Sequence, residues 1–168
     1  MIHIYTGNGK GKTSAAVGMV MRAYGYGRRV AFLQFMKGRD TGEIKALRSL
    51  QGILVEQFGS SNFVNLSSPD SEAKEYAQKG VERALDLIRQ DCPDLVVLDE
   101  FNVALSAGLI DQDAALSLID RFPDDKLLIL TGRYAPQYLI DLADLVTEMK
   151  EIKHPFQKGI PAKEGIDY

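Results

Sequence analysis

Short apolar runs alternate along the chain with segments of helical periodicity. The apolar runs carry almost no polar residues at alternate positions, which is typical of strands in a parallel sheet whose two faces are both covered. Strands are expected at residues 2–5, 30–35, 53–58, 95–98 and 127–130 and at the weaker run 145–149. Helices are expected at residues 12–24, 43–50, 72–89, 113–120 and 136–143. The alternation predicts an α/β fold, with a mostly parallel sheet flanked by helices.

The length of 168 residues and the composition, 45% hydrophobic and 26% charged, indicate a single domain spanning residues 1–168. The formal net charge is −3, and acidic and basic residues are interleaved along the chain. The chain therefore has no extended positive surface that would attract the phosphates of a nucleic acid. No apolar run approaches the roughly 20 residues needed to cross a bilayer, and the first residues read as a strand. A lone cysteine, Cys92, suits a reducing compartment. We therefore expect a cytoplasmic protein that has neither nucleic acid nor a membrane as its partner.

The first predicted strand runs into a glycine-rich loop that opens a helix. The loop consists of Thr6, Gly7, Asn8, Gly9, Lys10, Gly11, Lys12, Thr13 and Ser14. Glycines let the backbone curl with its N–H groups pointing inward, and the helix N-terminus adds a partial positive charge. Lys12 is expected to reach the phosphates, and the Thr13 hydroxyl to bind Mg²⁺ or Mn²⁺.

This order of strand, loop, Lys-Thr pair and helix predicts a P-loop NTPase-like, RecA-like fold that binds the triphosphate of ATP. A glycine-rich turn that merely joins a strand to a helix is the alternative, and the order of the features disfavours it. The loop departs from the usual pattern at its start, because Thr6 stands where the first glycine is expected.

Polar residues also follow other predicted strands. The fourth strand is followed by Asp99 and Glu100. P-loop proteins hold Mg²⁺, or a water bound to it, with acidic residues at this position. The alternative is a strand that ends in acidic residues only because it reaches solvent there. Arg133 follows the fifth strand at the edge where open α/β folds bind ligands. It is a candidate phosphate ligand, with a surface ion pair to Asp141 as the alternative. Lys37, after the second strand, is another candidate at that edge.

Two segments break the pattern: residues 59–70 and the tail 153–168. The tail pattern favours a flexible basic end, with a flap over the site as the alternative. His3 lies within a strand and is expected to be a packed structural histidine. The sequence contains no Cys/His cluster with the spacing of a zinc site.

The whole chain resembles the ATP:corrinoid adenosyltransferases of the CobA/BtuR type, in a short form without an N-terminal extension. The resemblance is carried by residues 6–13, 34–38, 96–100, 131–133 and 141–144 and by the tail from 153 to 168. The ending, Gly165, Ile166, Asp167 and Tyr168, is the most distinctive part.

The resemblance implies transfer of the 5′-deoxyadenosyl group of ATP to Co(I) of a corrinoid, with release of triphosphate, in adenosylcobalamin synthesis or salvage. It implies that residues 7–13 form the loop that binds the triphosphate, and that Thr13 and Glu100 together bind Mg²⁺. The residues expected to act in catalysis are Lys12, Thr13 and Glu100. Asp99 would support the metal, and Lys37 and Arg133 would lie near the nucleotide or its phosphates. The resemblance further implies a homodimer and a flavoprotein reductant.

Two departures from the family pattern concern the corrinoid side of the site. Longer members carry an N-terminal extension that helps to cover the site, whereas this chain begins at its first strand. The family's aromatic corrin-facing segment corresponds to residues 59–64, and the chain has no tryptophan, so Phe63 is the candidate substitute. A P-loop phosphohydrolase or kinase therefore remains an alternative, as does a nucleotide-gated regulatory module without turnover. Triphosphate, ADP or no product would distinguish the three.

Overall fold

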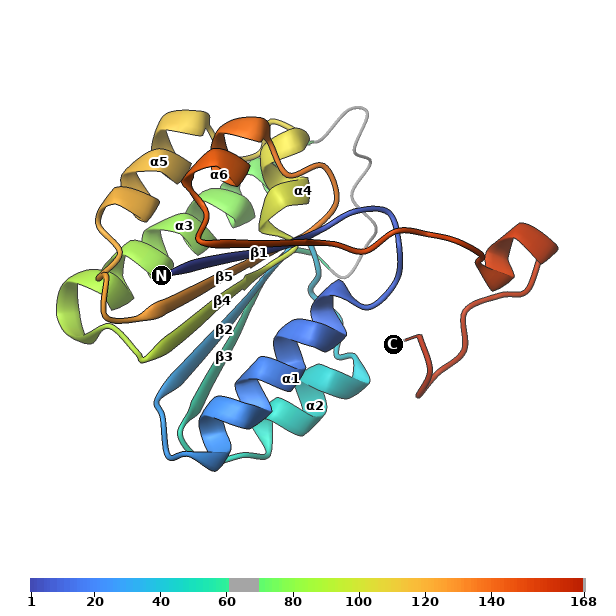
Figure 1. The fold of residues 1–168 in the computed structure, drawn as a ribbon, viewed down its shortest axis with the longest axis horizontal. Coiled ribbons are helices and arrows are strands. Elements are labelled where there is room, and N and C mark those ends of the chain that lie inside the picture. Colours follow the sequence, from blue (N-terminus) through green and yellow to red (C-terminus); the bar gives the residue numbers. More distant parts are fainter. Residues whose placement is uncertain (61–69, 168) are drawn as a thin grey trace.

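The computed structural model describes residues 1–60 and 70–167. Within these ranges the chain forms one six-stranded sheet in the order β3-β2-β4-β5-β1-β6, and every neighbouring pair is parallel (Figure 1). The strands are β1 (Ile2–Thr6), β2 (Val30–Phe35), β3 (Ile53–Phe58), β4 (Leu95–Asp99), β5 (Leu127–Thr131) and β6 (Leu145–Glu148). The predicted α/β class with a parallel sheet flanked by helices is confirmed.

Helices cover both faces of this sheet. They are α1 (Lys12–Gly25), α2 (Gly42–Arg48), α3 (Ser71–Asp91), α4 (Phe101–Ser106), α5 (Gln112–Asp120) and α6 (Gln137–Leu142), with a 3₁₀ turn η1 (Pro155–Lys158) in the tail. Figure 1 shows α1 and α2 on one face and α3 to α6 on the other. None of the helices in the described ranges is long and apolar enough to cross a membrane.

The core consists of two apolar layers, one on each side of the sheet. Along β2, Phe32 packs toward α1 and α2, whereas Leu33 and Phe35 pack toward the α3 side. Full burial of each such side chain contributes about 1.5–3 kcal/mol. The edge strands differ from the central ones, because β3 is half-buried throughout and β6 is exposed throughout. Only the central strands therefore have the two covered faces that the sequence pattern predicts.

Among the described residues, three non-glycine residues with positive φ follow strands at one edge of the sheet. They are Met36 after β2 (φ 62°), Glu100 after β4 (φ 59°) and Tyr134 after β5 (φ 62°). Non-glycine residues in the left-handed region cost of order 1–3 kcal/mol each and cluster at functional sites. This edge holds the carboxyl ends of the parallel strands, where open α/β folds bind ligands.

The sequence misplaced or missed some elements. Strands β1, β4 and β5 run one residue further than expected and end in Thr6, Asp99 and Thr131, because buried partners there satisfy polar side chains inside the strands. Helix α4 was not expected at all. It has six residues, of which five are buried, so it shows no amphipathic periodicity.

Candidate active site

The loop after β1 curls against the end of β6. Gly7 and Gly11 have φ of 93° and 111°, values that residues with a Cβ rarely adopt. A Cβ on Gly7 would lie 2.5 Å from the Met149 carbonyl oxygen, and one on Gly9 would lie 2.7 Å from it. The Gly9 N–H donates to that same oxygen at 2.6 Å. Gly7 and Gly9 are thus required by contact with the backbone at the end of the edge strand, and Gly11 by its positive φ.

Lys12 lies within this curl. Its ammonium donates to the carbonyl oxygens of Gly7 at 2.8 Å and Gly9 at 2.6 Å. Burial lowers the pKa of Lys12, while the negative charge of Glu100 works to raise it. A half-buried cation surrounded by loop backbone can stabilise an anion that binds at the helix N-terminus.

Asp99 at the end of β4 is fully buried and accepts three side-chain hydrogen bonds. Thr13 Oγ1 donates to Asp99 Oδ1 at 2.8 Å and Thr131 Oγ1 donates to the same oxygen at 2.6 Å. Gln34 Nε2 donates to Asp99 Oδ2 at 2.9 Å. Because its hydrogen is committed to Asp99, the Thr13 hydroxyl keeps its lone pairs for another ligand.

Glu100 and Lys37 form an ion pair at 3.2 Å across the carboxyl ends of β4 and β2. The left-handed backbone at Glu100 is held by a hydrogen bond from its N–H to Thr131 Oγ1 at 3.0 Å. Burial works to lower the pKa of Lys37, but the charges of Asp99 and Glu100 outweigh it and raise that pKa. Lys37 is therefore a firmly charged cation beside two carboxylates.

Arg133 is exposed and reaches the same site from the end of β5. The alternative partner considered for it, Asp141, instead accepts a hydrogen bond from Gln137 at 2.8 Å. The preceding Gly132 (φ 132°) lies against α4, where a Cβ would come within 3.1 Å of the Asn102 Cβ atom. Asn102 Nδ2 donates to the Gly132 carbonyl at 3.3 Å, so α4 positions the turn that carries Arg133.

Lys12, Thr13, Lys37, Glu100 and Arg133 line a cavity of about 680 Å³. One side is the loop and the start of α1, another is the strand ends, and a third is the tail. The lining residues are Asn8, Gly9, Lys10, Gly11, Lys12, Thr13, Ser14, Val17, Lys37, Gly42, Glu43, Glu100, Arg133, His154, Ala162, Gly165, Ile166 and Asp167. The volume is typical of small-molecule sites, which span about 300–1,000 Å³.

Most predicted site residues therefore come together. Gly7 lies behind the cavity against Met149, and Asp99 lies behind Thr13. Phe63 falls outside the described residues. Gln34, whose amide bonds Asp99, was not singled out, although a polar residue in an otherwise apolar buried strand is a usable signal.

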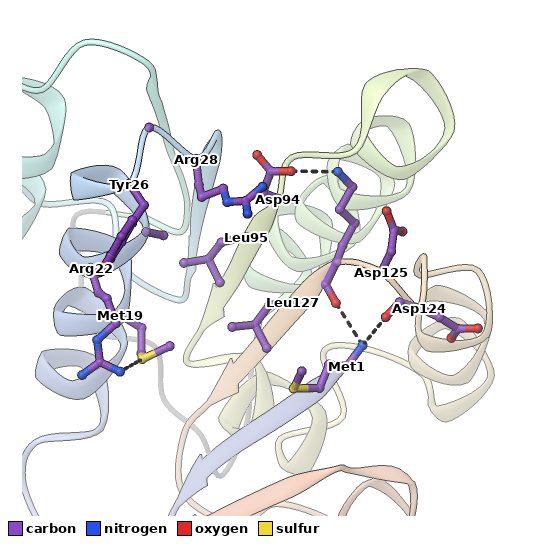
Figure 2. Close-up of a pocket in the computed structure, with 13 residues that line it drawn as sticks. Met1, Met19, Arg22, Tyr26, Arg28, Asp94, Leu95, Asp124, Asp125 and Leu127 are labelled. Atoms are coloured by element: carbon purple, nitrogen blue, oxygen red, sulfur yellow. Dashed lines mark hydrogen bonds and ion pairs between the residues drawn. The ribbon is translucent and has the colours of Figure 1, made fainter.

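A second cavity, of about 610 Å³, lies beside the end of α1 and the turn before β5 (Figure 2). Met19, Leu95 and Leu127 contribute apolar surface there, with Arg22 and Asp124 among the charged residues that line it. None of the predicted site residues that the structure describes lines this cavity. The predicted chemistry is thus concentrated in the cavity at the loop.

The donor atoms at the loop fit Mg²⁺ or Mn²⁺. The described residues contain no group of three or more His, Cys, Asp or Glu side chains that would hold a metal by themselves. Mg²⁺ is usually bound by one or two carboxylates together with substrate phosphates and waters. The Thr13 hydroxyl and the Glu100 carboxylate line the cavity and are hard oxygen donors of that kind, so they fit an ion shared with a nucleotide, with Asp99 behind them as the acceptor that orients Thr13.

Strand β1 leads into a glycine-rich loop that holds Lys12, and helix α1 follows with its Thr13 hydroxyl donating to the buried Asp99. This arrangement defines a P-loop-like α/β protein. All 168 residues match the family model described as ATP:corrinoid adenosyltransferase BtuR/CobO/CobP. The chain belongs to that family, and the resemblance inferred from the sequence is confirmed.

Relatives agree with the family match. The corrinoid adenosyltransferase of a Sinorhizobium species is 37% identical over 100% of this chain and 80% of its own length. That of Pseudomonas aeruginosa is 36% identical over 98% of this chain and 82% of its own. Corrinoid adenosyltransferase CobA of Salmonella typhimurium is 32% identical over 100% of this chain and 85% of its own.

Proposed function

We propose that this chain is an ATP:corrinoid adenosyltransferase, which transfers the 5′-deoxyadenosyl group of ATP to Co(I) of a corrinoid and releases triphosphate. The observation that carries the proposal is a match to this family over the whole chain, in a protein whose cavity combines Lys12 with the Thr13–Asp99 pair. Adenosylcobalamin synthesis or salvage is the corresponding biological role.

The reaction needs no protein nucleophile. The electron pair of Co(I) attacks C5′ of ATP, a cobalt–carbon bond forms, and the C5′–O bond breaks with its electron pair left on triphosphate. The cobalt is thereby oxidised from Co(I) to Co(III). The protein's part is to orient C5′ toward cobalt and to stabilise the charge of the leaving group.

Residues at the loop are suited to that second task. Lys12, the loop N–H groups and the N-terminus of α1 would bind the triphosphate, since each carries positive or partial positive charge. Thr13 and Glu100 would hold Mg²⁺ or Mn²⁺, and the buried Asp99 would support that ion by orienting the Thr13 hydroxyl. The ion, when bound, supplies further positive charge against the triphosphate. Lys12, Thr13 and Glu100 are therefore the proposed catalytic residues.

Two further cations are proposed to bind the nucleotide. Arg133 lines the cavity, and no ion pair to it is found among the described residues, so its guanidinium is available for phosphate. Lys37 is held beside Glu100 and keeps its charge. The remaining loop residues Asn8, Gly9, Lys10, Gly11 and Ser14 would line the triphosphate.

Other expectations remain predictions. Phe63 would face the corrin, and the active form would be a homodimer served by a flavoprotein reductant. For the tail, where the sequence pattern favours a flexible basic end, we propose the alternative of a flap over the site, because Ala162, Gly165 and Ile166 line the cavity. We also propose a cytoplasmic location, since a chain with a single cysteine suits a reducing compartment. That cysteine, Cys92, is buried, and burial raises the pKa of its thiol, so it stays unreactive.

An anaerobic assay tests the proposal. Chemically reduced cobalamin, ATP and Mg²⁺ are mixed with the protein, the Co(I) absorption is followed, and the phosphate products are identified. We expect adenosylcobalamin together with intact triphosphate, in equal amounts, and loss of both products in Lys12→Ala. ADP without a cobalt–carbon bond would favour a phosphohydrolase or kinase instead, and tight ATP binding with neither product would favour a regulatory module.

A further inference from the structure

The C-terminal tail contacts the loop that follows β1. After β6 the chain runs away from the sheet, forms η1 and turns back, and its end lies near the start of α1 (Figure 1). There the Lys10 ammonium donates to the Ile166 carbonyl oxygen at 2.8 Å and forms an ion pair with the Asp167 carboxylate. We refer to these interactions of Lys10 with Ile166 and Asp167 as the tail contact.

A compact turn presents the Asp167 carboxylate to Lys10. The N–H groups of Ile166 and Asp167 both donate to the Lys163 carbonyl, at 3.2 and 2.8 Å, and Gly165 has a positive φ of 73°. The second Asp167 oxygen accepts from the Lys163 N–H at 2.8 Å. The hydrogen bond from the Lys10 ammonium is the main cause of a lowered pKa of Asp167, and the bond from the Lys163 N–H adds to it. This carboxyl therefore stays ionised near neutral pH.

Apolar burial does little to hold this tail in place. Ile152, Phe156, Ile160 and Ile166 are 83, 77, 43 and 67% exposed, whereas core side chains of the same types are fully buried. The loop, α1 and the strand ends form most of the cavity wall, but one side of it is formed by Ala162, Gly165, Ile166 and Asp167 of the tail. The position of that side of the wall therefore depends on the polar tail contact.

We propose that Asp167 is a positioning residue: by binding Lys10 it holds the tail as one wall of the nucleotide cavity. This inference rests on the proposed function only in taking that cavity to bind ATP. In this role Asp167 acts through Lys10 and the tail, and not as a ligand of phosphate or cobalt. Its effect is to keep the tail over the loop, which excludes water from the triphosphate, and to fix the direction of the Lys10 side chain.

The exposure of the pair sets the size of the effect. The side chains of Lys10 and Asp167 are 47% and 27% exposed, so solvent screens their attraction. Exposed ion pairs change an equilibrium by about 1.5- to 5-fold. A contact of this strength opens readily, which allows nucleotide to enter and triphosphate to leave.

Amide hydrogen exchange of the tail tests the inference without any turnover. In Asp167→Asn, exchange at Ile166 and residue 167 should be about 1.5- to 5-fold faster than in the unmodified chain, because the tail opens more often. Glu164→Gln is the matched control: Glu164 is an exposed acid in the same turn, and its neutralisation should leave exchange unchanged. Adding ATP with Mg²⁺ should slow tail exchange in the unmodified chain.

Charge reversal gives a stronger comparison. Asp167→Lys should speed exchange by more than Asp167→Asn does. Combining it with Lys10→Glu should make exchange slower than in Asp167→Lys alone, because the ion pair re-forms in the opposite sense, although the bond from the Lys163 N–H is not replaced. Steady-state kinetics add a second readout. In Asp167→Asn the KM for ATP should rise by the same 1.5- to 5-fold, while kcat at saturating ATP changes less than about twofold, because uniform binding is lost.

The outcomes separate this inference from the proposed function. Equal exchange in Asp167→Asn and the unmodified chain would overturn the inference even if adenosyl transfer is normal. Faster tail exchange on adding ATP would also overturn it, since the nucleotide would then displace the tail. Slower exchange with ATP and faster exchange in Asp167→Asn would support it, even if the cobalt–carbon bond never forms and the proposed function fails.

Discussion

Side-chain amides lead from Arg48 at the surface to the buried Asp99 carboxylate through a chain of hydrogen bonds whose direction is fixed. Arg48 Nη2 can only donate, and it donates to Gln57 Oε1 at 3.0 Å. Gln57 Nε2 then donates to Gln34 Oε1 at 2.9 Å, and to the Arg39 carbonyl at 3.0 Å. Gln34 Nε2 in turn donates to Asp99 Oδ2 at 2.9 Å. Neither glutamine amide can flip without losing bonds, so the chain must end in an acceptor at Asp99.

Asp99→Asn tests this directly. If the carbonyl oxygen of the new side chain keeps the bonds from Thr13 and Thr131, its NH₂ group faces the NH₂ group of Gln34 at the former 2.9 Å bond. The variant then loses one hydrogen bond to a charged group and leaves a buried donor unpaired, which costs about 2–3 kcal/mol of the free energy of unfolding. For a chain of this size the melting temperature should fall by about 4–12 °C.

Urea denaturation followed by circular dichroism measures the change, with Asp141→Asn as a surface control whose midpoint should not move. The double variant Gln34→Glu with Asp99→Asn provides the sharper test. In it the carboxylate introduced at position 34 would accept both from the amide introduced at position 99 and from Gln57, so the double variant should be more stable than either single variant. Two results would refute the reasoning: an Asp99→Asn variant as stable as the parent, or a double variant no more stable than Asp99→Asn.

Three further outcomes are expected. Lys12→Ala should lower kcat by about 10²–10³-fold in the adenosyl-transfer assay, because a preorganised donor to the leaving group is lost; an unchanged rate would remove Lys12 from the proposed triphosphate site. Gly7→Ala should abolish ATP binding in calorimetry, since its Cβ would lie 2.5 Å from the Met149 oxygen; normal affinity would contradict the packing. Bonds from Lys126 and the Arg29 N–H lower the pKa of Asp94, so it stabilises the fold above its unfolded-state pKa and loses that effect as the pH falls through the lowered value. Asp94→Asn should flatten the acid side of the stability profile, and an unaltered profile would count against the shift.

Strand positions could be predicted because their signal is local. Val30–Phe35 and Ile53–Phe58 are mainly apolar and rich in residues that favour strands, and their observed bounds match the expected ones. Helix α4 could not be predicted, because it is buried on nearly all sides and too short to show a period. Its N-cap, Glu100, adopts a left-handed backbone that no local preference of glutamate would indicate.

The site was predictable where parallel strands bring their ends together. Lys12, Thr13 and Glu100 meet because β1 and β4 run in the same direction in one sheet, so the motif order alone indicates a shared edge. The bond from Gln34 to Asp99 depends on strand order, which the sequence left open. The return of the tail to Lys10 depends on an ion pair between opposite ends of the chain, and no local pattern reports such a pair.

The contact between the loop and Met149 limits how far the glycine motif can be moved. Gly7 and Gly9 lack side chains because a backbone carbonyl at the end of β6 occupies that space, and the Gly9 N–H is bonded to it. A loop with the same amino-acid sequence, grafted onto a sheet that lacks β6, would lose this contact. In protein engineering the loop should therefore be transferred together with its edge strand.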